Sequence, residues 1–360
     1  MAFIELNKSK LKRNFDLIND RFKEKHIDWG IVTKLLCGNR KYLQEVLDLG
    51  IEEIHDSRIS NLQAVKELNP KVQTVYIKPP AKRSLDKIVE FADVSFNTEF
   101  YTINLLSEEA QRQNKTHKII IMIELGDLRE GVMGEAFVDF YRKVFQLPNI
   151  KVVGIGSNLN CLHGVMPSED KFIQLSLYKE LIKAHFNVDI PYVSGGTSVV
   201  LSMFYKNKLP AAVNHFRIGE TLFFGANIEE NSVFEGMYDD VLKLRAEVIE
   251  LTEKPLIPVG ELAENPSGEK LEVDETLYGK TTLRAIIDLG LLDISPDFLI
   301  PDDSDIEVIG ASSDMLVLDL GNTKRDYNVG DLIDFKLKYM GALGIMNSDY
   351  IEKRIRTTKL

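Results

Sequence analysis

The chain has 360 residues, 44% hydrophobic and 28% charged, which is the composition of a soluble globular protein with a large core. Aspartate and glutamate (55) outnumber lysine and arginine (44), and the net charge of −11 argues against general nucleic-acid binding. The sequence has two cysteines, no apolar run long enough to span a membrane and no basic, apolar leader, so we expect a cytoplasmic protein without disulfides. At this length, two domains are expected.

The first two-thirds of the chain alternates short apolar runs with longer amphipathic runs. Short runs rich in β-branched residues and bounded by turn residues are typical of buried parallel strands. Helical patterns lie between them, for example over residues 40–49, 61–68 and 171–185. Strands separated by helices in this way favour a (β/α)8 TIM barrel, an α/β fold, over the alternative of a doubly wound sheet. The eight apolar runs begin at Gly30, Ile51, Val72, Ala92, Ile119, Val152, Tyr192 and Val213.

The pattern changes after Gly225, where strand-like stretches are separated by glycine, asparagine and aspartate turns. Such spacing predicts a smaller, mainly β domain. We therefore expect a barrel over residues 1–228 and a mainly β C-terminal domain over residues 229–360. One alternative assigns residues 1–7, with the apolar run Phe3–Leu6, to the second domain. The strands expected in that domain span residues 242–250, 282–288, 306–309, 315–319 and 332–337.

Lys34 follows the first predicted barrel strand directly, within Val32–Gly38. Functional groups of such barrels sit at the carboxyl ends of the strands, so this lysine is expected at the barrel mouth. Removal from water there disfavours the charged ammonium and favours a nucleophilic amine. The alternative is a solvated loop lysine without a chemical role.

Two glycine-containing loops, Ser194–Ser198 and Arg217–Glu220, follow the last two predicted strands. Glycines let the backbone close on an anion, and small hydroxyls and helix N-terminal amides donate hydrogen bonds to it. The loops after strands seven and eight are the usual phosphate site of these barrels, although each glycine-containing loop by itself is more often a plain turn. The predicted phosphate-site residues are Ser194, Gly195, Gly196, Thr197, Gly219 and Glu220.

Arg129 and Asn158 follow the fifth and sixth predicted strands. An arginine suits a substrate carboxylate or a phenolate, and the alternative for Arg129 is an ion pair with Asp127 or Glu130. Asn158 is expected against a ligand ring or, alternatively, in a hydrogen bond to a neighbouring loop. The six histidines form no i, i+4 ligand pair, so no metal site is expected.

Taken together, these motifs resemble those of the fold-type III pyridoxal-phosphate enzymes, the group of bacterial alanine racemase, and in particular the ornithine racemase-like branch. The resemblance covers nearly the whole chain. It rests on the segments Val32–Gly38, Leu125–Gly131, Gly154–Leu159, Ser194–Ser198, Phe216–Glu220, Pro258–Glu261 and Gly310–Asp314.

The resemblance implies that pyridoxal phosphate is the cofactor and that Lys34 holds it as an internal aldimine. It also implies that Arg217 faces the pyridine nitrogen and that Asn158 stands where alanine racemases carry a histidine against the ring. Because an arginine stays protonated, it cannot take a proton from that nitrogen, and the weaker electron sink suits racemisation over transamination. The resemblance assigns the phosphate to Ser194, Tyr350 and the backbone amides of Gly195, Gly196, Gly219 and Glu220.

One segment departs from the alanine racemase pattern. In those enzymes, a tyrosine of the partner subunit is the second base, and Leu291 and Leu292 stand in its place here. Another group must then carry the second proton, because leucine cannot. The candidates for this role are Asp293, Ser312, Ser313 and Cys161; Arg129, Asp293, Ser312 and Ser313 are the expected substrate contacts.

These features predict a homodimeric racemase of a free amino acid that depends on pyridoxal phosphate. Loss of the tyrosine and the negative net charge favour ornithine, or another basic or polar amino acid, over alanine. The alternatives are an aldolase or decarboxylase on the same fold, a low-turnover protein that binds pyridoxal phosphate, and a phosphate-binding barrel without this cofactor. Neither a nucleic acid nor a membrane is an expected partner.

Overall fold

A computed structural model of the chain describes residues 2–264, 268 and 270–357. Its contacts divide the chain into a barrel unit, residues 7–241 and 357, and a second unit, residues 2–6 and 242–356. Residues 229–241, which the sequence assigns to the second domain, belong to the barrel unit. The domain assignments of residues 1, 265–267, 269 and 358–360 lie outside the described part of the chain.

The barrel unit contains one parallel 9-stranded sheet with the order β8-β7-β6-β5-β4-β3-β2-β10-β9. Only Gly195 separates β8 from β9, so the two ends of this sheet meet and the sheet closes into a barrel. The predicted (β/α)8 barrel is confirmed, and its seventh strand is divided at Gly195. The strands are β2 (Asp28–Val32), β3 (Glu53–Asp56), β4 (Gln73–Tyr76), β5 (Val94–Asn97), β6 (His117–Met122), β7 (Ile150–Gly156), β8 (Tyr192–Ser194), β9 (Gly196–Thr197) and β10 (His215–Ile218).

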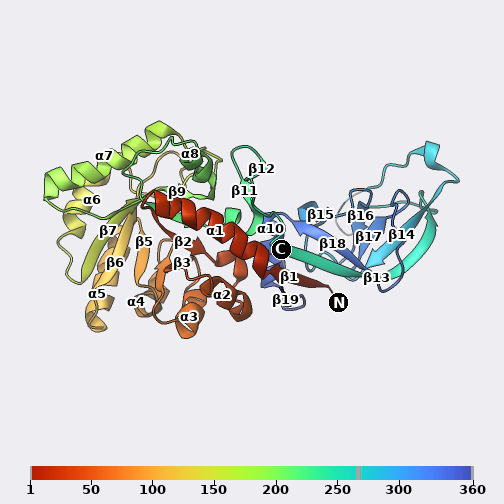
Figure 1. Ribbon diagram of the computed structural model, residues 1–360, viewed down its shortest axis with the longest axis horizontal. Coiled ribbons are helices and arrows are strands. Elements are labelled where there is room, and N and C mark those ends of the chain that lie inside the picture. The colour runs from red at the N-terminus through yellow and green to blue at the C-terminus, as the bar shows by residue number, and fades with distance from the viewer. Residues whose placement is uncertain (1, 265–267, 269, 358–360) are drawn as a thin grey trace. The chain divides into compact units, whose positions relative to one another are not determined.

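Helices follow the strands and cover the outer face of this barrel (Figure 1). The first begins where the Asn7 side chain accepts hydrogen bonds from the backbone of Ser9 and Lys10, both at 3.1 Å, as an N-cap does. A small pair, β11 (Ala226–Asn227) and β12 (Ser232–Val233), follows the last helix. The helices are α1 (Lys8–Glu24), α2 (Arg40–Leu47), α3 (Ile59–Leu68), α4 (Leu85–Phe91), α5 (Phe100–Arg112), α6 (Phe137–Val144), α7 (Glu169–Phe186), α8 (Leu201–Tyr205) and α9 (Glu220–Phe224), with 3-10 turns η1 (Lys34–Leu36), η2 (Lys82–Ser84), η3 (Gly134–Ala136) and η4 (Ser198–Val200).

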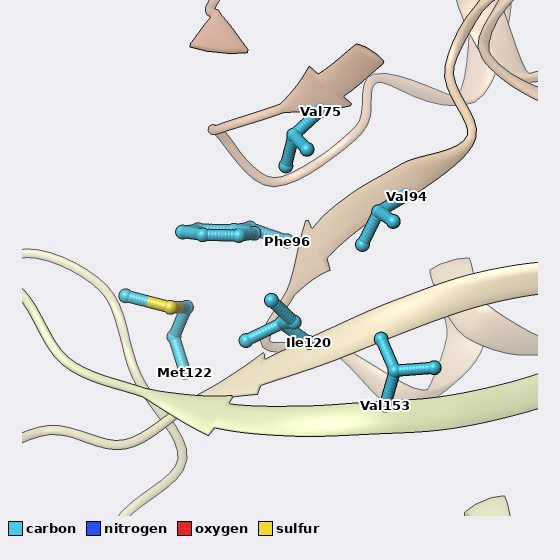
Figure 2. Close-up of a cluster of buried hydrophobic side chains, with 6 residues drawn as sticks. All are labelled: Val75, Val94, Phe96, Ile120, Met122 and Val153. Carbon is cyan, nitrogen blue, oxygen red and sulfur yellow. The ribbon is translucent and has the colours of Figure 1, made fainter. Parts of the chain in front are cut away.

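One half of the barrel interior is apolar. Side chains from β4, β5, β6 and β7 converge there and are almost fully buried (Figure 2). They alternate along each strand with side chains that face the helices, which explains the near-continuous apolar runs in the sequence. This cluster comprises Val75, Val94, Phe96, Ile120, Met122 and Val153.

The second unit is built on an antiparallel 8-stranded sheet, which confirms the expected mainly β domain. The run Phe3–Leu6 pairs with Leu242–Arg245 in this sheet. The sequence did not predict its short strands β15 and β19 or its helix. The elements are β1 (Phe3–Asn7), β13 (Leu242–Pro255), η5 (Glu275–Leu277), β14 (Thr281–Ile287), η6 (Pro296–Phe298), β15 (Leu299–Pro301), β16 (Glu307–Ala311), β17 (Leu316–Asp319), β18 (Leu332–Leu337), α10 (Tyr339–Asn347) and β19 (Glu352–Arg356).

Across the described residues of both units, no helix combines the length and the apolar character that a membrane span requires.

Candidate active site

Lys34 lies at the carboxyl end of β2, where it opens the 3-10 turn η1. The chain is fixed on both sides of it, because Thr33 is buried and donates its backbone N–H to the His55 carbonyl at 2.8 Å, while Leu35 is buried behind it. The Lys34 side chain itself is exposed. The structure therefore presents the lysine at the barrel mouth on a rigid backbone.

A buried carboxylate lies beside the start of this turn. Asp56, the last residue of β3, accepts hydrogen bonds from the Thr33 hydroxyl at 2.9 Å, the Arg58 backbone N–H at 2.9 Å and the Asn61 amide at 3.1 Å. Burial raises the pKa of Asp56 to about 6, against the effect of these hydrogen bonds. The carboxyl group of Asp56 therefore titrates near neutral pH. It is hydrogen-bonded to Thr33, the residue that precedes Lys34.

The end of β10 lies next to Lys34. A Cβ atom on Gly219 would stand 3.1 Å from the Cβ of Val32, so the two strand ends are in close contact. Glu220 begins α9, and burial raises the pKa of its carboxyl, whereas the nearby Lys34 ammonium lowers it. The structure thus brings Lys34, Gly219 and Glu220 together, as the positions of the strand ends predict.

Arg217 is the most extensively bonded side chain of the site and is 4% exposed. Its Nη1 donates to the Ser194 carbonyl at 2.6 Å and to the Ser194 hydroxyl at 2.7 Å. Its Nη2 donates to the Ser157 carbonyl at 2.8 Å and to Asn158 Oδ1 at 2.6 Å. No described residue accepts a hydrogen bond from the Nε–H of Arg217. Burial lowers the pKa of Arg217 to about 10, so the guanidinium remains charged at neutral pH.

Ser194, which the sequence assigns to the phosphate, lies in the barrel interior. Its side chain is fully buried, and its hydroxyl is bonded to Arg217 and, at 2.7 Å, to His215 Nδ1. A hydroxyl engaged in this way by two side chains is a support for Arg217 rather than a donor to a ligand at the barrel mouth.

The loop after Ser194 is shaped by close packing. A Cβ atom on Gly196 would stand 2.1 Å from the ring of Phe216, so only glycine fits here. The hydroxyl of Ser198 accepts the backbone N–H of Thr221 at 3.2 Å and thereby joins this loop to the start of α9. Sequence reasoning gave Ser198 no role, although it closes the segment Ser194–Ser198 that carried the prediction.

Arg129 forms an ion pair with Glu130, which is the alternative that the sequence left open. Glu130 Oε1 also accepts from Asn158 Nδ2 at 2.6 Å, and Asn158 in turn accepts from Arg217. A continuous polar chain therefore runs from the exposed Arg129 to the buried Arg217. Asn158 is tied to its neighbours through both atoms of its amide.

The loop after β7 is held by a single carboxylate. Asp127 is 1% exposed and accepts backbone N–H groups of Cys161 and Leu162, both at 2.9 Å, and of His163 at 3.2 Å. Burial by itself would raise the pKa of Asp127, but these backbone donors outweigh it and lower the pKa. Cys161 is thereby held at the barrel mouth, within electrostatic range of Arg129 and Arg217.

The remaining predicted site residues belong to the second unit. The backbone N–H groups of Leu291 and Leu292 donate to the carbonyls of Ser312 and Ser313 at 2.9 and 2.8 Å, so these two segments lie together. Asp293 accepts from the backbone of Gly290 at 3.3 Å within the same turn. Tyr350 lies elsewhere in this unit, between α10 and β19, with 79% of its surface exposed.

The barrel residues fit pyridoxal phosphate. The lysine at the end of β2 supplies the amine that the aldehyde requires, and the loop Gly195–Ser198 with the start of α9 supplies backbone and hydroxyl donors for a phosphate. Four of the five N–H bonds of Arg217 are already used, so the Nε–H remains for an acceptor such as a pyridine nitrogen.

Comparisons with known proteins find similarity over nearly the whole chain. Residues 6–227 match the family described as "Alanine racemase, N-terminal domain". An ornithine racemase of Acetoanaerobium sticklandii is 33% identical over 353 residues, 98% of this chain and 99% of that protein. A lysine racemase of Thermotoga maritima is 32% identical over 350 residues, 97% and 96% of the two chains. An alanine racemase structure from Bartonella henselae with covalently bound pyridoxal phosphate matches with a TM-score of 0.74 at 14% identity, covering 99% of each chain.

The barrel, the family match and the whole-length similarity to racemases thus define a fold-type III pyridoxal-phosphate enzyme. The chain belongs to the alanine racemase family. The expected class, an amino-acid racemase that depends on pyridoxal phosphate, is confirmed.

Proposed function

We propose that this chain racemises a basic amino acid, ornithine or lysine, in preference to alanine. The observation that carries the proposal is the whole-length similarity to racemases named for these two substrates. The leucines at positions 291 and 292 support it, because they replace the bulky tyrosine that helps to confine a small substrate in the alanine racemases. When bound, pyridoxal phosphate supplies the electron sink that acidifies the Cα proton of an amino acid.

Lys34 is proposed to hold the cofactor and to take and return the Cα proton on one face. The backbone of η1 is fixed by Thr33 and Leu35, so the amine returns to the same place after each turnover. Glu220 lies near enough to Lys34 for its carboxyl group to interact electrostatically with the lysine side chain. This arrangement suits a group that alternates between base and acid.

The phosphate is proposed to bind at the loop Gly195–Ser198 and the backbone of Gly219 and Glu220. Ser198 takes the place assigned to Ser194, because its hydroxyl lies between the loop and the start of α9. The role of Tyr350 at the phosphate, and those of Asp293, Ser312 and Ser313 at the substrate, stay predictions.

Arg217 is proposed to face the pyridine nitrogen through its Nε–H. Because the guanidinium stays charged, it donates a hydrogen bond and takes up no proton, so the ring nitrogen remains unprotonated. The Asn158 amide, bonded to both Arg217 and Glu130, keeps the plane of the guanidinium constant.

We also propose a cytoplasmic homodimer. Neither Cys37 nor Cys161 forms a disulfide, which suits a reducing compartment. Leu291 and Leu292 are 44% and 71% exposed, and a partner chain over this turn would remove them from water. Light scattering at micromolar concentration should give twice the mass of one chain. A monomer with full activity would contradict the proposal.

The function is tested by incubating the purified protein with L-ornithine, L-lysine and L-alanine in deuterated water. Chiral chromatography with mass detection should show deuterated D-product, with kcat/KM for ornithine or lysine at least about tenfold above alanine. Lys34→Ala is the inactive control.

Other products would contradict the proposal. Glycine and an aldehyde from a β-hydroxy amino acid would indicate an aldolase, and release of carbon dioxide would indicate a decarboxylase. Bound cofactor without conversion of any amino acid would indicate a binding protein.

A further inference from the structure

The half of the barrel interior opposite the apolar cluster is polar. β3, β8 and β10 carry side chains there that are less than one-tenth exposed and yet titratable or hydroxylated. Buried polar groups are costly unless they are hydrogen-bonded, so their partners are informative. Phe96 belongs to the apolar cluster and lies at its boundary with the polar half of the interior, since the Arg217 guanidinium is 5.3 Å from the centroid of its ring. The polar side chains are Glu53, His55, Ser194, His215 and Arg217.

Glu53 lies at the deep end of this group. Its carboxylate contacts Nε2 of His215 at 2.7 Å and also contacts the His55 ring and the Gln73 amide. Burial alone would raise the pKa of Glu53, but the two histidines outweigh it and hold the pKa well below the ordinary value. An ionised carboxylate only accepts hydrogen bonds, so each of these neighbours must be the donor.

This requirement sets the direction of every hydrogen bond above Glu53. His215 donates from Nε2, so in the neutral ring Nδ1 is an acceptor. Nδ1 lies 2.7 Å from the Ser194 hydroxyl, which therefore donates to it. The lone pairs of Ser194 Oγ are then left for Arg217 Nη1 at 2.7 Å. With a neutral His215 ring, every hydrogen bond in the chain Glu53–His215–Ser194–Arg217 has a defined direction.

The backbone makes room for this chain. Gly30 on β2 pairs in register with Arg217, and a Cβ atom on Gly30 would stand 2.3 Å from Cδ2 of His55. Any other residue at position 30 would clash with the His55 ring and displace it. The first barrel strand thus has a glycine at the point where the polar group needs space.

We propose that Glu53 and His215 are positioning residues for Arg217. Acting through Ser194, they orient the hydroxyl and hold the guanidinium so that its Nε–H stays available to the pyridine nitrogen. The inference rests on the proposed function, since it assigns Arg217 to that nitrogen. It extends the site from the barrel mouth to the first residues of β3 and β10.

A metal ion is the competing interpretation of part of this group. Donor atoms of Glu53, His55 and His215 lie within 4.8 Å of one another, and two histidines with a glutamate are zinc ligands elsewhere. In this structure the nitrogens contact the carboxylate directly, and Ser194 bonds the other nitrogen of His215. Hydrogen bonds therefore account for both nitrogens of His215 and for Nε2 of His55, whereas the buried Nδ1 of His55 has no hydrogen-bond partner among the described residues.

The chain offers a matched control. Ser95 and His117 form another buried serine–histidine hydrogen bond in the same barrel, at 2.8 Å. Within the described part of the chain, neither residue forms a hydrogen bond with Arg217. The test compares Ser194→Ala and His215→Phe with Ser95→Ala and His117→Phe. Each purified protein is reconstituted with ¹⁵N-labelled pyridoxal phosphate, and the pyridine ¹⁵N chemical shift, the cofactor Kd, kcat and KM are measured.

We expect the pyridine ¹⁵N chemical shift to change in Ser194→Ala and His215→Phe. In the two control variants it should equal that of the parent protein. The kcat should fall about tenfold to a hundredfold in the first pair, the size typical of losing a supporting contact to a functional group, with KM nearly unchanged. Ser194→Ala removes a single oxygen atom, so it keeps the test decisive if His215→Phe does not fold.

Equal pyridine shifts in all variants would overturn the inference, as would a stoichiometric metal that is lost in Glu53→Gln. A parent protein that binds the cofactor and shows the expected shifts, but converts no amino acid, would retain the inference and refute the proposed reaction. A parent protein that binds no pyridoxal phosphate would overturn both.

Discussion

The hydroxyl of Thr33 donates a hydrogen bond to the buried carboxylate of Asp56 at 2.9 Å. This contact joins the end of β2, where Lys34 begins its turn, to the end of β3. An ionisable group that is inaccessible to water thus supports the residue that we propose as the cofactor-binding lysine. The effect of this buried carboxylate on the free energy of unfolding can be measured.

Asp56→Asn should stabilise the protein at neutral pH. Burial raises the folded-state pKa of Asp56 to about 6, above the ordinary value of 3.8, so the folded state takes up a proton more readily than the unfolded state. The parent therefore loses stability relative to the variant as pH rises from 4 to 6, by up to about 3 kcal/mol. Urea unfolding at pH 4 and pH 7 measures this change.

The exposed Asp139 on α6 provides the control for this measurement. Asp139→Asn should show no comparable dependence between the two pH values. A constant difference between Asp56→Asn and the parent at both pH values would show that folding does not raise the pKa of Asp56.

Lys34→Ala should abolish both the visible absorbance of bound cofactor and the racemase activity. The amine at this position is the proposed covalent attachment point, and alanine offers neither an amine nor a proton carrier. Absorbance spectra after dialysis and chiral assays check this. A variant that stays coloured and active would show that another lysine holds the cofactor.

Asp127→Ala should loosen the loop after β7. The change removes the acceptor for the backbone N–H groups of Cys161, Leu162 and His163, which are then left without their buried partner. We expect a loss of about 3 kcal/mol in the free energy of unfolding. Hydrogen exchange should become faster in these amides while the amides of β6 stay protected. Asp127→Asn keeps one acceptor oxygen and should have an intermediate effect.

Cys161→Ala tests the second proton carrier. Cys161 is the candidate on the barrel unit, held by Asp127 near Arg129 and Arg217. If its thiol serves the face opposite Lys34, inversion should fall at least about a hundredfold while Cα deuterium exchange with retention persists. Cys37→Ala is the matched control. Equal inversion rates in Cys161→Ala and the parent would leave the role to the second unit.

The sequence by itself determined the barrel and the position of Lys34. Apolar runs separated by amphipathic helices are a local signal, and strand ends in a barrel converge whatever the side chains are. The resemblance to the alanine racemases rests on short contiguous segments, which are also legible without a structure. The expected mainly β second domain followed from turns and strand patterns in the same way.

Only the tertiary structure decided which polar side chains face one another inside the barrel. Ser194 was expected at the phosphate, but its place on β8 turns it inward, where it contacts His215 and Arg217. Glu53 and His55 alternate on β3, a pattern that could have indicated an inward polar face, yet the sequence does not name their partners. Glu53 meets His215 across a separation of 162 residues. Such contacts depend on strand register and barrel closure, and these are set by the packing of the whole barrel rather than by any local segment.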